Sequence, residues 1–191
     1  FLTYDLHQLP ETLTKVIVSD MTGKISEEHP VVAPSGMMEI CKNLSAGIYV
    51  IQLTSGSNST RPIKILKMDA NLNIVWTSTK DGYGNDDLGQ TMALDNFGNI
   101  YVAGYFTNTS NRKEACLLKY NSDGVFQWQQ IIKSAFDGDA VAWKVKVLDN
   151  YIYVVGDVKN ETDKDILIFV YDANGNQIFT KPIDSGSGGN D

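Results

Sequence analysis

The residues best suited to chemistry are two groups of aspartates that recur at a fixed distance. Asp86 and Asp87 lie in GYGNDDLG, Asp137 and Asp139 lie in FDGDA, and Asp87 and Asp139 are 52 residues apart. Carboxylates gathered on one rim of a repeat structure could bind a ligand or act as the acid and base of a hydrolase. Solvated loop ends are the simpler interpretation, because Asp and Gly are also common in turns. These four aspartates are the candidate binding residues, and no catalytic or metal-ligating residue is predicted.

Three short polar segments raise the question of a bound cation. They read DANLN from Asp69, NSDG from Asn121 and DANGN from Asp172. Each resembles the opening of a calcium-binding loop, in which alternating side-chain oxygens surround the ion, but none is followed by the glutamate that completes such a loop. Asn, Asp and Gly also tolerate the left-handed backbone of hairpin turns. We therefore expect turns at these positions, and calcium and other cofactors are not predicted.

Histidine and cysteine offer little for catalysis or zinc binding. His7 and His29 are the only histidines, they stand 22 residues apart, and no His/Cys group has zinc-ligand spacing. Cys41 and Cys116 lie in strand-like apolar stretches, where a buried free thiol acts as a small hydrophobic side chain; a disulfide between them stays open. The sequence has no Gly-x-Ser-x-Gly nucleophile motif. These features favour a protein that is not an enzyme.

Net charge and apolar runs limit the class of partner. The formal charge of −7 leaves no basic stripe for phosphate groups, so nucleic acid is not expected as a partner. No apolar run approaches the roughly 20 residues that cross a bilayer, so no membrane span is expected.

The elements that would position the candidate side chains are copied along the chain. The tripeptide Ile-Tyr-Val begins at Ile48, Ile100 and Ile152, each 52 residues after the last, and Trp76 and Trp128 keep the same spacing. A fixed spacing is expected when one structural unit is repeated, because each copy places its equivalent strand at the same offset. The chain is therefore predicted to be a repeat protein.

Each unit reads as four short strands. In the second full copy these are ACLLKY, VFQWQQIIK, AVAWKVKVL and YIYVVGDV, which alternate or are rich in β-branched and aromatic residues. Four antiparallel strands in about 40 to 50 residues are typical of a propeller blade. The predicted fold is therefore all-β, with four-stranded propeller-type blades at a period of 52 residues. Trp76 and Trp128 are predicted to be buried at equivalent places between units.

The segment LLKYNSDGVFQWQ, with the Gly-Asp loop and Tyr-Val-x-Gly strand that follow it, carries a resemblance to a known family. It resembles the β-propeller repeat of secreted and surface proteins of Bacteroidota-type bacteria. The resemblance covers residues 63–191, as two full units and the start of a third, and Leu72 of the first copy stands where the family has glycine. It implies a secreted or cell-surface protein.

Residues 1–62 allow two interpretations. VIVSDMTGKI and LSAGIYVIQLTSG resemble the sorting domain of the Bacteroidota type IX secretion system, a small β-sandwich. The alternative is a degenerate blade, in which Tyr49 keeps the 52-residue spacing but no Trp follows the turn. Both interpretations stay open.

Together these features predict a non-catalytic, secreted or cell-surface β-repeat scaffold or binding module. The expected partner is a protein or a glycan at the cell surface. Closed propellers have about 4 to 8 blades, so we also expect the chain to belong to a longer propeller protein or to self-associate through open blade edges. The alternative function is a surface hydrolase or lyase that uses rim carboxylates of a propeller.

Overall fold

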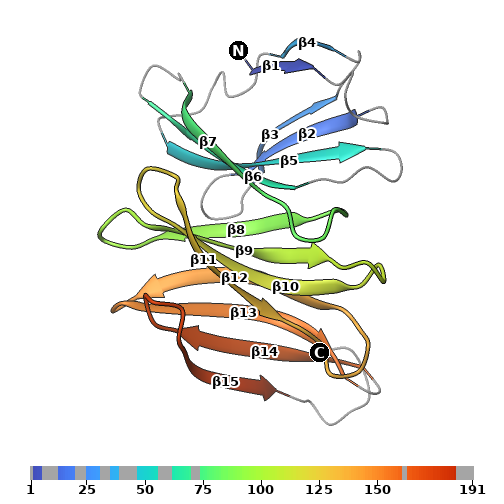
Figure 1. Ribbon diagram of the computed structural model, residues 1–191, viewed down its shortest axis with the longest axis vertical. Helices are drawn as coiled ribbons and strands as arrows, with labels where there is room; N and C mark the ends of the chain where they lie inside the picture. The colour runs from blue at the N-terminus through green and yellow to red at the C-terminus, as the bar shows by residue number, and fades with distance from the viewer. Residues whose placement is uncertain are drawn as a thin grey trace.

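A computed structural model describes residues 62–69, 74–160 and 163–183, together with the backbone of five strands between residues 2 and 55. Every element in this part of the chain is a β-strand, so the all-β prediction is confirmed (Figure 1). The first seven strands are β1 (Leu2–Asp5), β2 (Leu13–Ser19), β3 (Ile25–Pro30), β4 (Ser35–Met38), β5 (Gly47–Ser55), β6 (Ile63–Met68) and β7 (Ile74–Lys80). The next eight are β8 (Leu88–Leu94), β9 (Ile100–Thr107), β10 (Lys113–Tyr120), β11 (Phe126–Ile132), β12 (Ala140–Leu148), β13 (Tyr151–Lys159), β14 (Lys164–Tyr171) and β15 (Gln177–Ile183).

The strands form four antiparallel sheets. β1 pairs with β4, and a five-stranded sheet has the order β3-β2-β5-β6-β7, so it joins strands from both sides of residue 62. Two four-stranded sheets follow, in the orders β11-β10-β9-β8 and β12-β13-β14-β15. We call them the middle sheet and the C-terminal sheet. In Figure 1 the sheets succeed one another from the N-terminal to the C-terminal end of the molecule and, over the described residues, do not close into a ring.

The strands predicted for the second copy are confirmed, but they do not form one sheet. ACLLKY and VFQWQQIIK correspond to β10 and β11 of the middle sheet, whereas AVAWKVKVL and YIYVVGDV correspond to β12 and β13 of the C-terminal sheet. The boundary between sheets falls at residues 133–139, which carry the chain across to the next sheet. The other connections are hairpins; between β12 and β13 only Asp149 (φ 49°) and Asn150 (φ 66°) intervene.

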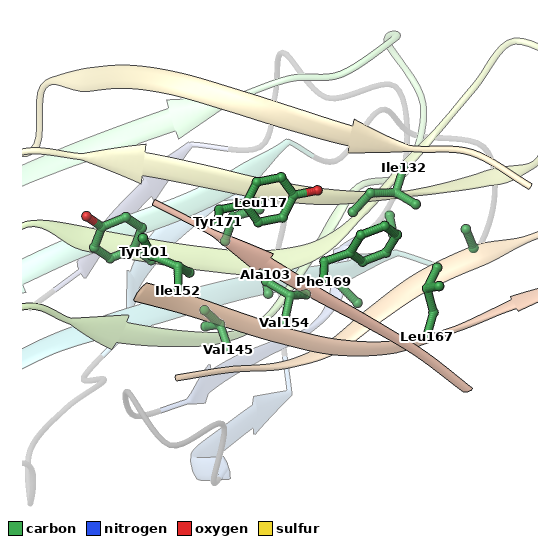
Figure 2. Close-up of a cluster of buried hydrophobic side chains, with 13 residues drawn as sticks. Tyr101, Ala103, Leu117, Ile132, Val145, Ile152, Val154, Leu167, Phe169 and Tyr171 are labelled. Carbon is green, nitrogen blue, oxygen red and sulfur yellow. The ribbon is translucent and has the colours of Figure 1, made fainter. Parts of the chain in front are cut away.

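The central strands of the middle sheet, β9 and β10, are buried on both faces. Ile100 and Val102 of β9 pack with Ile63 and Ile65 of the five-stranded sheet. The alternate residues of β9, such as Tyr101, point the other way and pack against the C-terminal sheet. Figure 2 shows this second cluster, in which Tyr101, Ala103, Leu117 and Ile132 face Val145, Ile152, Val154, Leu167, Phe169 and Tyr171. A strand with two covered faces must be apolar throughout, which explains the continuous apolar run of β9.

Two glycines let neighbouring strands approach within their sheets. A Cβ atom added at Gly104 of β9 would lie 1.8 Å from the carbonyl oxygen of Leu88, and one at Gly156 of β13 would lie 2.1 Å from that of Val141. Register shifts occur beside these contacts, in β8 and in β12. The bulged strand therefore occupies the space that a side chain would need.

The turn prediction is confirmed at two of the three polar segments. Oδ1 of Asn121 accepts hydrogen bonds from the N–H groups of Asp123 (3.0 Å) and Val125 (2.9 Å). Asp172 does the same for Asn174 and Asn176, both at 2.8 Å. These side chains close the β10–β11 and β14–β15 turns, and the segment from Asp69 lies largely outside the described residues.

Candidate functional site

Asp87 is a buried anchor for the loop before β8. Its Oδ2 accepts a hydrogen bond from the Gly82 N–H (2.7 Å) and its Oδ1 accepts one from the Thr107 N–H (3.0 Å), and the residue is only 6% exposed. Burial raises the pKa of the Asp87 carboxyl to about 6, against the lowering effect of the two backbone hydrogen bonds. The carboxylate therefore ties the loop at 81–87 to the end of β9.

Asp139 has a similar role between two sheets. Its Oδ1 accepts a hydrogen bond from the N–H of Lys113, the first residue of β10, and its backbone carbonyl accepts one from the Lys159 N–H (2.9 and 2.8 Å). Lys113 is the register partner of Thr107, the residue that Asp87 holds. Asp87 and Asp139 are thus brought to the same end of the β9–β10 pair, where both carboxylates receive backbone donors.

Asp86 and Asp137 are used differently. The backbone carbonyl of Asp86 accepts a hydrogen bond from the Thr107 hydroxyl. Asp137 adopts a left-handed backbone (φ 48°), and its side chain is 87% exposed, 3.9 Å from Nη2 of Arg112. An ion pair this exposed contributes little to stability. Asp137 is therefore the most exposed of the four candidate aspartates.

A polar cluster around Glu114 is the feature that the sequence did not indicate. The Glu114 carboxylate is buried and accepts hydrogen bonds from the Tyr83 hydroxyl (2.6 Å) and Asn108 Nδ2 (2.9 Å). Nζ of Lys133 lies 3.1 Å from the same carboxylate, and Asn85 Nδ2 donates to the carbonyl of Asn108 at 2.9 Å. The cluster joins β10 to the end of β11 and to the 81–87 loop.

The electrostatics of this cluster favour a fixed charge over proton transfer. Burial alone raises the pKa of Glu114, but the hydrogen bonds from Tyr83, Asn108 and Lys133 outweigh it and lower the pKa below its usual value. The hydrogen bond to Glu114 raises the pKa of Tyr83, and the same carboxylate raises the pKa of Lys133. At neutral pH the glutamate stays ionised while the tyrosine and lysine stay protonated. The arrangement therefore stabilises structure and lacks a group poised to act as a base.

Part of the cluster recurs in the C-terminal sheet. Asn160 Nδ2 donates to Oδ1 of Asp165 at 2.9 Å, as Asn108 donates to Glu114 in the middle sheet. Asp165 is likewise buried. The signal was present in the sequence, because Lys-Glu at 113–114 and Lys-Asp at 164–165 each follow an asparagine at the end of the preceding strand. The repeat comparison alone could have paired these residues.

The two tryptophans occupy equivalent places between sheets, as predicted, although each is partly rather than fully buried. Trp76 of β7 lies against Gly124 in the β10–β11 turn, where an added Cβ would lie 2.6 Å from the indole. Trp128 of β11 lies against Gly175 in the β14–β15 turn, where the same distance is 3.1 Å. Each tryptophan thus packs on the turn glycine of the next sheet.

Polar groups fix the second of these junctions. Nε1 of Trp128 (3.2 Å) and Nζ of Lys119 (2.7 Å) both donate to the carbonyl of Ala173, and Nε2 of Gln130 donates to the carbonyl of Gly175 at 2.8 Å. The Trp128 and Tyr101 rings lie 6.0 Å apart. The junction therefore combines aromatic packing with three hydrogen bonds to one turn.

The described part of the chain holds neither a metal-binding group of side chains nor a helix that could cross a membrane. Among its residues no group of three or more His, Cys, Asp or Glu side chains could hold a metal ion. No helix there has the length and apolar character needed to cross a membrane. Cys116 is a free, fully buried thiol, and burial raises its pKa. Comparison of the sequence with profiles of known protein families and with curated proteins gives no match.

Proposed function

We propose that the chain is a non-catalytic β-repeat scaffold or binding module whose sheets are propeller-type blades. The observation that carries the proposal is the repeated junction, in which a tryptophan of one sheet packs on the turn glycine of the next. Equal contacts at successive junctions are expected of an array of repeats, where each unit covers the face of its neighbour. In further support, β12 to β15 begin 51 or 52 residues after β8 to β11.

The chemistry of the described polar residues supports a scaffold over an enzyme. Asp87 and Asp139 accept hydrogen bonds from backbone N–H groups, and the ionised Glu114 carboxylate is held by three donors. A surface hydrolase would need a carboxylate free to accept or donate a proton at the reacting bond. Of the four candidate aspartates, Asp137 alone is an exposed residue, and its carboxylate lies next to the Arg112 guanidinium.

A paired substitution separates the two functions. We expect Asp139→Asn to lower the urea midpoint of the purified chain, because the amide replaces a charged acceptor of the Lys113 N–H, whereas Asp137→Asn leaves the midpoint unchanged. The same proteins are incubated with surface polysaccharides and nitrophenyl glycosides, and release of reducing ends or nitrophenol is measured. The scaffold releases neither product. Release that either substitution abolishes without loss of stability would establish the hydrolase instead.

The proposed location is outside the cell, at the surface of a Bacteroidota-like bacterium, where the partner is a protein or a glycan. This part of the proposal rests on the sequence resemblance. Proteinase treatment of intact host cells, followed by detection with an antibody to this chain, is the test. The chain is degraded if it is exported, and its survival until the cells are lysed contradicts export.

A further inference from the structure

The outer face of the C-terminal sheet carries a group of apolar side chains, most of which are partly exposed. We define this outer face by the apolar side chains that point away from the middle sheet on β13, β14 and β15: Tyr153, Val155, Ile166, Ile168, Val170, Phe179 and Ile183. Four charged residues lie in the same rows, namely Lys144, Lys146, Asp157 and Lys181. Phe179 is 49% exposed, and Val155 and Ile183 are each 40% exposed. These residues are cross-strand neighbours, since Tyr153 pairs with Val170 and Val170 with Phe179. They form one group, in which Val170 is only 9% exposed, and an exposed apolar patch of this kind marks a site of interaction.

The ladder positions of this patch are covered in the preceding sheet. In the middle sheet Tyr101 pairs with Lys119 and Lys119 with Trp128, which repeats the row from Tyr153 to Phe179. The next rows also correspond, so that the buried residues Ala103, Leu117, Ala115 and Ile132 stand where the outer face has Val155, Ile168, Ile166 and Ile183. What covers those residues is a set of side chains from β12, β13 and β14 of the C-terminal sheet, in the cluster of Figure 2. The same ladder positions are therefore covered in the middle sheet and mostly partly exposed in the C-terminal sheet.

The outer face also has residues at the ladder positions that contact the β14–β15 turn in the junction between the middle and C-terminal sheets. Phe179 has the ladder position of Trp128, which packs on Gly175, and Lys181 has that of Gln130, which donates to the Gly175 carbonyl. Lys181 is exposed and carries N–H donors, as Gln130 does. The Phe179 ring and the Lys181 ammonium group could therefore contact the glycine of a further turn and its carbonyl.

We propose that the outer face is the docking face for a further four-stranded antiparallel sheet of the same repeat, seated with its last turn on Phe179 and Lys181. The inference rests on the proposed function, because it extends the array of stacked sheets by one. Continuity with the interface between the middle and C-terminal sheets identifies this occupant.

The test adds the proposed further sheet to the same polypeptide. A second copy of residues 140–183 is placed directly after Asp191, which stands 52 residues after Asp139 and so keeps the repeat spacing. Val155→Cys in the first copy, in a Cys41→Ser background, provides a thiol on the outer face, and its rate of reaction with a maleimide is measured. We expect the added sheet to slow labelling about tenfold or more relative to the chain without the added copy, because a covered thiol reacts only after local opening.

Two controls make the result specific. The thiol from Val155→Cys placed in the added copy should react fast, since nothing covers the last sheet. Gly175→Val in the added copy should restore fast labelling of the first, because φ is +86° at this glycine and a side chain there would meet the aromatic ring.

Three outcomes would overturn the inference. One is unchanged labelling of the first copy. Another is an added copy that stays unfolded by circular dichroism, with or without a short Gly-Ser linker, because the docking face should template its folding. The third is a stable dimer of the unextended chain that Val155→Lys dissociates, which would make the occupant a second copy. The stability of Trp128→Ala is measured in parallel. A loss of stability in this variant supports the stacking of the middle and C-terminal sheets even if the further inference fails.

Discussion

Phenylalanine at the two inter-sheet tryptophans separates the value of one hydrogen bond from that of the packing around it. Trp76 and Trp128 contact equivalent turn glycines, but only Nε1 of Trp128 donates, to the Ala173 carbonyl. Nε1 of Trp76 is buried and finds no acceptor among the described residues. Tryptophan-to-phenylalanine substitution removes the N–H and the same part of the ring at both places, so the loss of ring area largely cancels in the comparison.

The expected difference follows from the partners. In Trp128→Phe the Ala173 carbonyl keeps its bond from Lys119, so the loss is that of one satisfied hydrogen bond, about 1 kcal/mol. In Trp76→Phe a buried unsatisfied donor disappears, which returns about 1 to 3 kcal/mol of desolvation cost. We therefore expect Trp76→Phe to be the more stable variant by about 2 kcal/mol or more.

Equilibrium urea unfolding followed by far-UV circular dichroism measures this difference without depending on tryptophan fluorescence. With a slope of about 2 kcal/mol per molar urea, the two midpoints should differ by about 1 M. Equal midpoints, or a lower midpoint for Trp76→Phe, would refute the reasoning and mean that the two junctions are satisfied in the same way.

Three further predictions concern single residues. Gly104→Ala should cost about 3 kcal/mol or more in urea unfolding, because its Cβ would lie 1.8 Å from the Leu88 carbonyl oxygen, whereas the control Gly84→Ala, with nothing within 4 Å, should cost only the strain of its positive φ, about 1 to 2 kcal/mol. Because the folded pKa of Asp87 is raised to about 6, its contribution to the free energy of unfolding should be fully present below about pH 4 and be lost as pH rises through 6, a dependence that Asp87→Asn should remove from urea midpoints measured between pH 4 and 8. Glu114→Gln should destabilise the chain by about 1.5 to 3 kcal/mol, since three donors lose a charged acceptor, and a thermal melt unchanged by this substitution would contradict the cluster's structural role.

Strand positions were predictable where local pattern decides them. β12 spans the nine residues of AVAWKVKVL, and Trp76 and Trp128 took the equivalent places that their spacing predicted. The sheet boundary was not predictable in the same way. A strand of either sheet carries the same apolar signal, so the crossing at residues 133–139 depends on which strands pair in three dimensions.

The candidate aspartates show a second limit of sequence reasoning. Asp87 and Asp139, which share the repeat spacing, hold the paired ends of β9 and β10. The spacing could not tell whether their oxygens meet solvent or backbone N–H groups, because that depends on the path of the loop from residue 81 to residue 87. The Glu114 cluster was missed for the same reason, since its donors come from segments up to 31 residues away in sequence.

The glycine contact in β9 bears on how faithfully strands find their partners during folding. In a strand with one polar face, a slip by one residue exposes apolar side chains and is rejected; β9 is apolar on both faces, so polarity does not penalise the slip. The close contact between Gly104 and the Leu88 carbonyl penalises the slip, because any neighbouring residue moved to the position of Gly104 would bring a Cβ atom against that carbonyl. Gly156 repeats the same fit in β13, so the contact fixes the alignment of a pair without distinguishing one copy from another. The short hairpins must therefore prevent strands of different copies from exchanging, because each hairpin allows a strand to pair only with the next strand in the chain. Asp149 and Asn150 form the shortest hairpin among the described residues.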